Sequence, residues 1–231
     1  MEKENEENKM SNIKSAYKKL GKNSFYDGMI TSTTFLGSLV NRIVWRMDKA
    51  ENREYLQKAL SPIPADFSGK LLEVPVGTGV LTMPLYKKLK KADIVCLDYS
   101  AEMMSRAENR ADEAHINNIR FMQGDVGALP FVDGRFDMVL SLNGFHAFPD
   151  KDAAYSETYR VLKKGGILCG CFCVVGESKR TDWFIEKPYT KMGYCTPPFE
   201  TKESLEKRLK SMYSDVHIET VKSMACFRCV K

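Results

Sequence analysis

The chain has 231 residues, of which 43% are hydrophobic and 28% charged, and its formal net charge is +5 at pH 7. This composition excludes collagen-like, low-complexity and wholly disordered chains, and so small a charge gives no sign of a nucleic-acid partner. The longest apolar stretch, residues 165–176, is shorter than the roughly 20 residues of a membrane-spanning helix, so no membrane span is expected.

The first 60 residues predict a tail followed by helices. Residues 1–12 are acidic and polar, unlike a signal peptide, and offer almost nothing apolar to offset the entropy of ordering. We therefore expect a disordered tail and a cytoplasmic protein. Across residues 13–60 apolar side chains recur at helical spacing, which predicts a helical segment ended by Pro62 and Pro64.

Residues 61–231 alternate between short apolar strands and polar-faced helices, which predicts a mostly parallel sheet covered on both faces. We expect strands over residues 70–76, 93–98, 118–123, 136–142 and 167–175, with helices over 80–90, 101–115 and 153–162, the last closed by Lys163-Lys164-Gly165-Gly166. A helix over 202–213 and strands over 216–221 and 225–230 follow. The link between these last strands is too short for a crossover, so they pair antiparallel. The predicted fold class is α/β with seven strands.

A long connection, residues 176–201, interrupts this pattern. It carries several aromatic residues, including Trp183, Tyr189 and Tyr194. Long loops in compact domains are usually functional or disordered, and the aromatic content favours a functional, lid-like insertion.

The seven cysteines lie mostly in apolar runs and read as reduced core thiols. Cys226 and Cys229 have a spacing that redox chemistry or half a zinc site uses. However, the chain has no second pair of this kind, and none of the histidines His115, His146 and His217 has a recognisable ligand spacing. We therefore expect no metal site.

A Gly-x-Gly turn, Gly77-Thr78-Gly79, follows the first strand and precedes a helix. Such a turn lets backbone approach a ligand closely and directs free N–H groups at it. A dinucleotide-binding domain would have a third glycine where Thr82 stands. Glu73, at the end of the strand, would also repel a diphosphate, so the pattern favours a cationic ligand.

Two further acids follow the next two strands. Asp98 ends the second strand, where a carboxylate accepts hydrogen bonds from a ribose diol. Its alternative role is to cap the next helix, but Ser100 can fill that role. Asp125, beside Gly124 after the third strand, suits an adenine, which offers an amine donor and a ring-nitrogen acceptor.

From about residue 65 to residue 175 the sequence resembles the class I S-adenosylmethionine-dependent methyltransferases, and within them the small-molecule group that includes the quinone C-methyltransferases. Residues 73–79 resemble the family's first motif, Asp98 its ribose acid and residues 124–126 its adenine loop. Leu129-Pro130-Phe131 and residues 136–139 and 157–166 follow in the family's order. The pair Tyr26-Asp27, together with Trp45, also resembles the quinone C-methyltransferases, but more loosely.

The resemblance implies a Rossmann-like fold and S-adenosylmethionine as cofactor. The cofactor residues that it implies are Glu73, Pro75, Gly77, Gly79, Asp98, Tyr99, Met103, Gly124, Asp125, Val126 and Asn143. Pro75 is a departure, because the family usually has its first glycine there. Proline fixes φ and lacks an N–H, so we expect a reshaped loop or a weaker affinity.

The resemblance further implies methyl transfer to a small, partly apolar acceptor by in-line displacement. His146, just after the fourth strand, is the candidate general base, with a structural role equally open. Residues 13–60 and 176–201 are expected to form a lid in which Tyr26, Trp183, Tyr189 and Tyr194 contact the acceptor or only pack on the core. The alternatives are a non-catalytic cofactor-binding or partner module and a nicotinamide-dependent oxidoreductase. The sequence does not indicate the oligomeric state.

Overall fold

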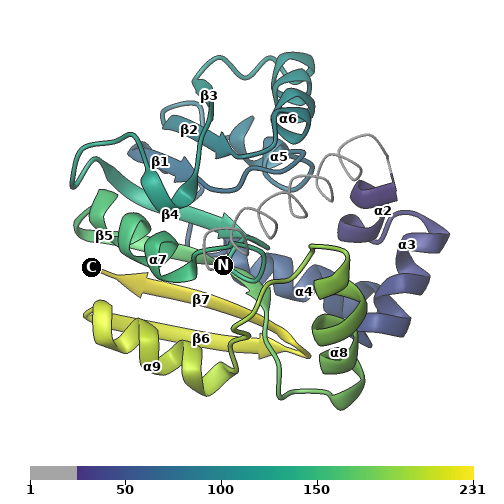
Figure 1. The fold of residues 1–231 in the computed structure, drawn as a ribbon. Helices are drawn as coiled ribbons and strands as arrows, with labels where there is room; N and C mark the ends of the chain where they lie inside the picture. Colours follow the sequence, from purple (N-terminus) through teal and green to yellow (C-terminus); the bar gives the residue numbers. More distant parts are fainter. Residues whose placement is uncertain (1–24) are drawn as a thin grey trace, which may run out of the picture.

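Seven strands form one sheet in the order β3-β2-β1-β4-β5-β7-β6 within residues 25–231, the part of the chain that the computed structural model describes (Figure 1). They are β1 (Lys70–Glu73), β2 (Asp93–Asp98), β3 (Ile119–Gln123), β4 (Phe136–Leu142), β5 (Leu162–Cys173), β6 (Asp215–Val221) and β7 (Met224–Val230). The first five strands pair in parallel, and β7 runs antiparallel to both β5 and β6. The expected Rossmann-like sheet with an antiparallel final strand is thus confirmed. The tail expected over residues 1–12 lies outside the described residues.

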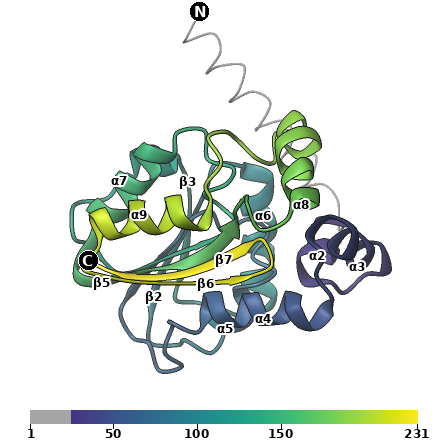
Figure 2. The same cartoon turned by 90° about the horizontal axis from the view of Figure 1, so that it is seen from below.

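Helices cover both faces of this sheet (Figure 2). Before β1 come α2 (Phe25–Thr31), α3 (Phe35–Val40), the π-helical turn η1 (Asn41–Trp45) and α4 (Lys49–Leu60), and the later helices are α5 (Met83–Tyr86), α6 (Ala101–Glu113), η2 (Val126–Ala128), α7 (Lys151–Val161), α8 (Lys179–Phe184), η3 (Ile185–Tyr189) and α9 (Lys202–Met212). One apolar cluster joins α4, α5 and α6 to the sheet, and the other joins α7 and α9 to the opposite face. Beyond these layers, α2, α3 and α8 gather at one end of the molecule (Figure 2).

Two elements near the first strand are shorter than expected. The strand predicted over residues 70–76 ends at Glu73, because Pro75 has no N–H to continue the ladder. Pairing nevertheless resumes around it, since Val74 N donates to Leu140 O and Val76 N to Leu97 O. The helix predicted over residues 80–90 is reduced to α5, and the chain continues in tight turns, with bonds such as Leu89 N to Tyr86 O that reach back only three residues.

Two later segments also differ from expectation. Lys163-Lys164-Gly165-Gly166 does not close α7 but belongs to β5, where Gly165 N donates to Lys231 O and Lys231 N to Gly166 O. The connection over residues 176–201 is not an open loop, because α8 and η3 occupy its first half. Ser178 caps α8, and Thr181 Oγ1 donates to Val44 O, which ties this helix to η1. No helix within residues 25–231 is long and apolar enough to cross a membrane.

Candidate functional site

A cavity of about 620 Å³ opens at the carboxyl ends of β1, β2, β3 and β4. Ligands of open α/β sheets bind at this edge. All eleven residues that the sequence analysis assigned to the cofactor line the cavity, so the structure brings them together. They come from the ends of β1 and β2, from the segments that follow the four strands, and from the first turn of α6.

The glycine turn, Gly77-Thr78-Gly79, forms one wall of this first cavity. Both glycines have positive φ, +56° and +69°, which other residues rarely adopt. A Cβ at Gly77 would meet nothing within 4 Å, because the position faces open space. The turn therefore leaves room for a ligand against the backbone.

Asp98 supports this turn from the end of β2. Its Oδ2 accepts a hydrogen bond from Gly77 N and its Oδ1 one from Ser100 N, both at 2.8 Å. Burial raises the pKa of Asp98 to about 6, against the opposing effect of these backbone donors. Ser100 caps α6 with its own hydroxyl, so the helix has a cap other than Asp98.

Glu73 lines the cavity at the end of β1 and is only 1% exposed. Tyr86 donates its hydroxyl hydrogen to the Glu73 carboxyl at 2.9 Å, and the Cys96 thiol contacts the same oxygen at 3.6 Å. Burial raises the pKa of Glu73 to about 8, so the group is mostly neutral at pH 7. Glu73 therefore carries little charge at pH 7 and repels a diphosphate much less than an ionised carboxylate would.

Asp125 has a local partner as well. Its Oδ1 accepts a hydrogen bond from Gly127 N at 2.8 Å and caps η2. The capping bond orients the carboxylate at the cavity wall, next to Gly124.

A second cavity of about 540 Å³ adjoins the first. The two share Tyr26, Ile30 and Asn143 as lining residues. Aromatic rings line the second cavity: Trp45 lies 5.7 Å from Tyr189, and Tyr189 lies 5.9 Å from Tyr194, measured between ring centroids.

Trp183 was expected beside these aromatic rings, but the structure places it elsewhere. It is 56% exposed, packs edge-on against Phe184 and lines neither cavity. The expected lid residues therefore separate into cavity residues and one surface residue.

His146 lines the second cavity, in the turn after β4. Its buried ring nitrogen Nδ1 has no hydrogen-bond partner among the described residues. Burial, with a smaller contribution from the Lys151 ammonium, lowers the pKa of His146 to about 3. The imidazole is therefore neutral at pH 7 and a weak base.

Asp27 forms an ionic cluster that the sequence analysis missed. Its carboxylate in α2 accepts a hydrogen bond from Thr78 Oγ1 at 2.6 Å and pairs with Arg106 and with Arg110, the latter at 2.6 Å. Arg110 also donates to Thr78 O at 2.6 Å. We call these four residues the Asp27 cluster. The Tyr26-Asp27 pair and the i, i+4 spacing of the two arginines were visible in the sequence, but nothing in it joined them.

Comparison with known proteins gives consistent results. Residues 71–166 match the family described as "Methyltransferase domain". A demethylmenaquinone methyltransferase of Thermus thermophilus is 36% identical over 131 residues, which are 56% of this chain and 57% of that protein. A ubiquinone/menaquinone biosynthesis C-methyltransferase of Hahella chejuensis is 32% identical over 162 residues, 67% of this chain and 64% of that protein.

The chain thus spans roughly half to two thirds of the length of these two curated relatives. Among solved structures, a methyltransferase of Thermotoga maritima described as a possible histamine N-methyltransferase matches with a TM-score of 0.62 and 22% identity, over 87% of this chain and 98% of that one. This likeness shows the fold. The ordered motifs, the strand order and these matches agree: residues 71–166 match a methyltransferase domain, and the chain is similar to the class I S-adenosylmethionine-dependent methyltransferases in sequence and in fold.

Proposed function

We propose that this chain transfers a methyl group from S-adenosylmethionine to a small, partly apolar acceptor by in-line displacement. The observation that carries the proposal is the pair of cavities that meet at Tyr26, Ile30 and Asn143. We name the first the cofactor cavity and the second the acceptor cavity. In-line displacement needs the attacking atom about 3 Å from the methyl group, on the side opposite the sulfur from which the methyl departs, and two adjoining cavities can provide that arrangement.

The cofactor cavity fits S-adenosylmethionine by size and chemistry. Its volume, about 620 Å³, is within the usual range for small-molecule sites. Asp98 accepts backbone hydrogen bonds from Gly77 and Ser100, and its carboxylate lines the cavity, where we assign it to the ribose hydroxyls. We assign Asp125 and the backbone of Gly124 to the adenine, and the open face of Gly77 to close backbone contact. When bound there, S-adenosylmethionine supplies a methyl group that its sulfonium already activates.

The chain contributes mainly positioning and the exclusion of water. Tyr26 and Asn143 stand at the boundary between the cavities, where they restrict how an acceptor approaches. The Asp27 cluster fixes α2, and with it Tyr26, against the glycine turn. His146 presents an unpartnered ring nitrogen in the acceptor cavity, and we assign it to contact with the acceptor. A general base is needed only if the attacking atom still carries a proton at neutral pH.

The acceptor that suits this cavity best is a planar ring with an apolar substituent. Trp45, Tyr189 and Tyr194 offer aromatic faces on the lining, and α2, η1 and the segment after α8 enclose it. Two relatives are named for menaquinone or ubiquinone methylation, which supports a hydroquinone-like acceptor. We propose that the helices of residues 25–60 and the segment over residues 176–201 determine the choice of acceptor.

The test has two parts. Calorimetric titration of the chain with S-adenosylmethionine and with its demethylated product should show binding well below millimolar, and Asp98→Ala should weaken it strongly. Incubation with labelled S-adenosylmethionine and a panel of hydroquinones, phenols, thiols and amines should then show methyl transfer. Binding without transfer to any acceptor would favour a cofactor-binding module. Binding of a nicotinamide dinucleotide alone would favour an oxidoreductase.

We further propose that the chain works in a reducing compartment, the cytoplasm. All seven cysteines, which lie in the described part of the chain, are buried free thiols, and such thiols persist where disulfides are kept reduced. Fractionation of the native host cells tests this location. Our proposal includes no nucleic-acid partner.

A further inference from the structure

One wall of the acceptor cavity brings together the side chains of His146, Cys173 and Cys195. The ring nitrogen and the two sulfurs all lie within 4.8 Å of one another, and no other group of three or more His, Cys, Asp or Glu side chains in residues 25–231 is so close. The residues come from the turn after β4, the end of β5 and the loop after η3. Three segments of the chain that are far apart in sequence therefore converge on one point.

Cys173 and Cys195 are buried and His146 is half-buried, and the three side chains are poorly satisfied by other partners. Nδ1 of His146 is buried without a hydrogen-bond partner among the described residues. The sulfurs of Cys173 and Cys195 lie within 4.8 Å of each other, and a thiol is only a weak donor and acceptor, so neither satisfies the other well. All three residues line the acceptor cavity, so a ligand can reach them.

We propose that His146, Cys173 and Cys195 bind one zinc ion, with its fourth position open to the acceptor cavity. Two thiolates and one imidazole are a zinc donor set, and three protein ligands with an open position are typical of catalytic zinc sites. In a tetrahedral site of this kind the ligand atoms lie about 3.5 Å apart. The observed limit of 4.8 Å therefore calls for a closure of about 1 Å, which side-chain rotation provides.

Binding changes no oxidation state. Two zinc–sulfur bonds and one zinc–nitrogen bond form, two S–H bonds break, and the two thiol protons pass to solvent. The resulting group carries no net charge, because two thiolates balance the divalent cation.

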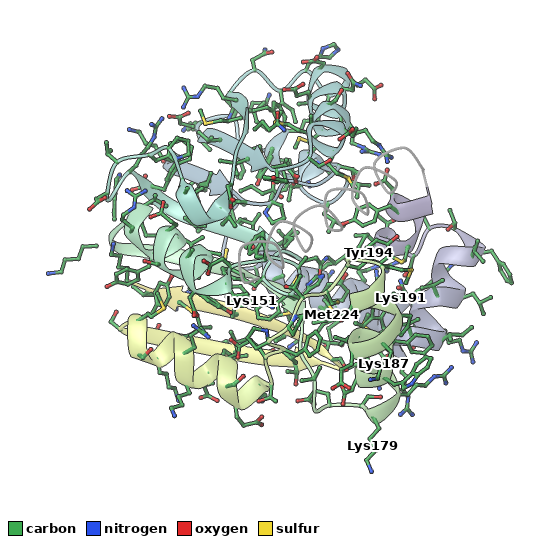
Figure 3. The ribbon with its side chains drawn as sticks, in the orientation of Figure 1. Lys151, Lys179, Lys187, Lys191, Tyr194 and Met224 are labelled. Atoms are coloured by element: carbon green, nitrogen blue, oxygen red, sulfur yellow. The ribbon has the colours of Figure 1, made fainter. Side chains whose placement is uncertain are left out.

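Lys151 is a cation beside the site. A zinc site in which two thiolates cancel the charge of the metal does not repel it. Its Nζ donates to Thr196 Oγ1 at 3.1 Å and to Pro198 O at 2.9 Å, so it remains on the α7 side. Figure 3 labels Lys151 there and shows Met224, another lining residue of the acceptor cavity, toward α8. Once zinc is bound by two thiolates, the Lys151 ammonium meets no net charge at the site.

The open fourth coordination position would let the zinc ion bind an acceptor in the cavity. This step rests on the proposed function: an oxygen or sulfur of the acceptor would occupy the position, and coordination would lower the pKa of that atom so that it reacts as an anion. An acceptor could then be activated even though His146 itself is a weak base. The sequence predicted no metal site because these three ligands lie far apart in the chain, without a regular spacing.

The experiment uses the full chain, reduced with a phosphine and freed of metal by chelation. Titration with zinc against a colorimetric chelator should show one equivalent bound. Cobalt should give the thiolate charge-transfer absorption and the strong visible bands of a tetrahedral site. Cys173→Ser, Cys195→Ser and His146→Ala should each lower zinc affinity by more than about 100-fold, the upper end of what losing a ligand's supporting partner costs. Cys229→Ser is the matched control, because Cys229 is a buried cysteine in the apolar cluster on the opposite face of the sheet.

A second measurement does not depend on variants that fold. In the wild-type chain, zinc should protect Cys173 and Cys195 from alkylation, as mapped by mass spectrometry, relative to Cys226 and Cys229. The proposal is overturned if zinc does not bind stoichiometrically, if cobalt gives no thiolate band, or if Cys229→Ser costs as much as the ligand variants. Because neither zinc measurement uses S-adenosylmethionine, a failed zinc site leaves the proposed function standing. A failed methyl transfer would leave the zinc site standing and remove only its role in activating the acceptor.

Discussion

Thr78, in the glycine turn, donates a 2.6 Å hydrogen bond to Asp27, 51 residues earlier in α2. The same carboxylate pairs with Arg106 and Arg110 of α6. One side chain thus joins the cover of the acceptor cavity to the loop and the helix that border the cofactor cavity. The first prediction follows from this bond.

Asp27→Asn should lower the free energy of unfolding by about 1–3 kcal/mol, because it leaves two partly buried guanidinium groups without their anion. Urea denaturation measures this loss, and hydrogen exchange should speed up across α2. The matched control is Asp93→Asn, whose ion pair with Arg120 is largely exposed and should be worth no more than about 1 kcal/mol. Equal losses in the two variants would contradict a special role for Asp27.

The affinity for S-adenosylmethionine should depend on pH through Asp98. Its pKa is raised to about 6 in the free chain, and only the ionised carboxylate accepts hydrogen bonds from both ribose hydroxyls. Affinity should therefore rise with pH up to about 6, by as much as about tenfold per unit, and level off above. Calorimetry between about pH 5 and about pH 8 measures the profile. In Asp98→Ala the rise of affinity with pH should vanish. If the affinity of this variant still rises with pH, a group other than Asp98 is responsible.

Stability should fall as pH rises, because of Glu73. The pKa of this group is about 8 in the folded chain and about 4.5 when unfolded, so the folded state holds the proton more tightly. Its contribution is fully present below about pH 4.5 and is lost as pH rises toward about 8, by at most roughly 4–5 kcal/mol. Urea denaturation of wild type and Glu73→Gln across this range measures the difference.

In Glu73→Gln most of the fall in the free energy of unfolding with rising pH should disappear. The part below about pH 6 should remain, because the raised pKa of Asp98 contributes there with the same sign. If the free energy of unfolding of the variant falls as steeply as that of the wild type between about pH 6 and about pH 8, Glu73 is ionised in the folded chain.

Gly77→Ala should weaken binding of S-adenosylmethionine, while Gly165→Ala should not. Both glycines have positive φ, and a Cβ at either would meet nothing within 4 Å, so both variants carry a similar backbone cost of about 1–2 kcal/mol. Only the Gly77 methyl would enter the cofactor cavity. Calorimetry and urea denaturation of both variants separate the two effects, and equal affinities would remove Gly77 from the site.

The sequence predicted the sheet well because its signals are local. The apolar run that ends in Asp98 predicts β2 with the bounds that the structure shows, and the short link at Ser223 predicts the antiparallel pairing of β6 with β7. The helix that contains a proline, α5, was harder to predict from the sequence. Met83-Pro84 starts α5, but the same apolar spacing suits the tight turns that follow, so periodicity alone overestimated the helix.

The acids of the candidate site were predictable because each follows a strand, and parallel strands end at one edge of the sheet. Contacts between segments that lie far apart in the sequence could not be predicted. Nothing local shows that Asp27 meets Arg110, or that Cys195 lies beside His146, because these pairs form only when the cover packs against the sheet. Burial likewise set the protonation of Glu73, which its sequence neighbours do not reveal.

Tyr26 lines both cavities, and its neighbour Asp27 binds the glycine turn, so the two binding events act on one helix. Such events are thermodynamically coupled whenever either ligand changes the position or rigidity of α2. The coupling is reciprocal: whatever factor the cofactor applies to acceptor affinity, the acceptor applies to cofactor affinity. An inhibitor of either cavity that changes α2 is thereby also an effector of the other cavity.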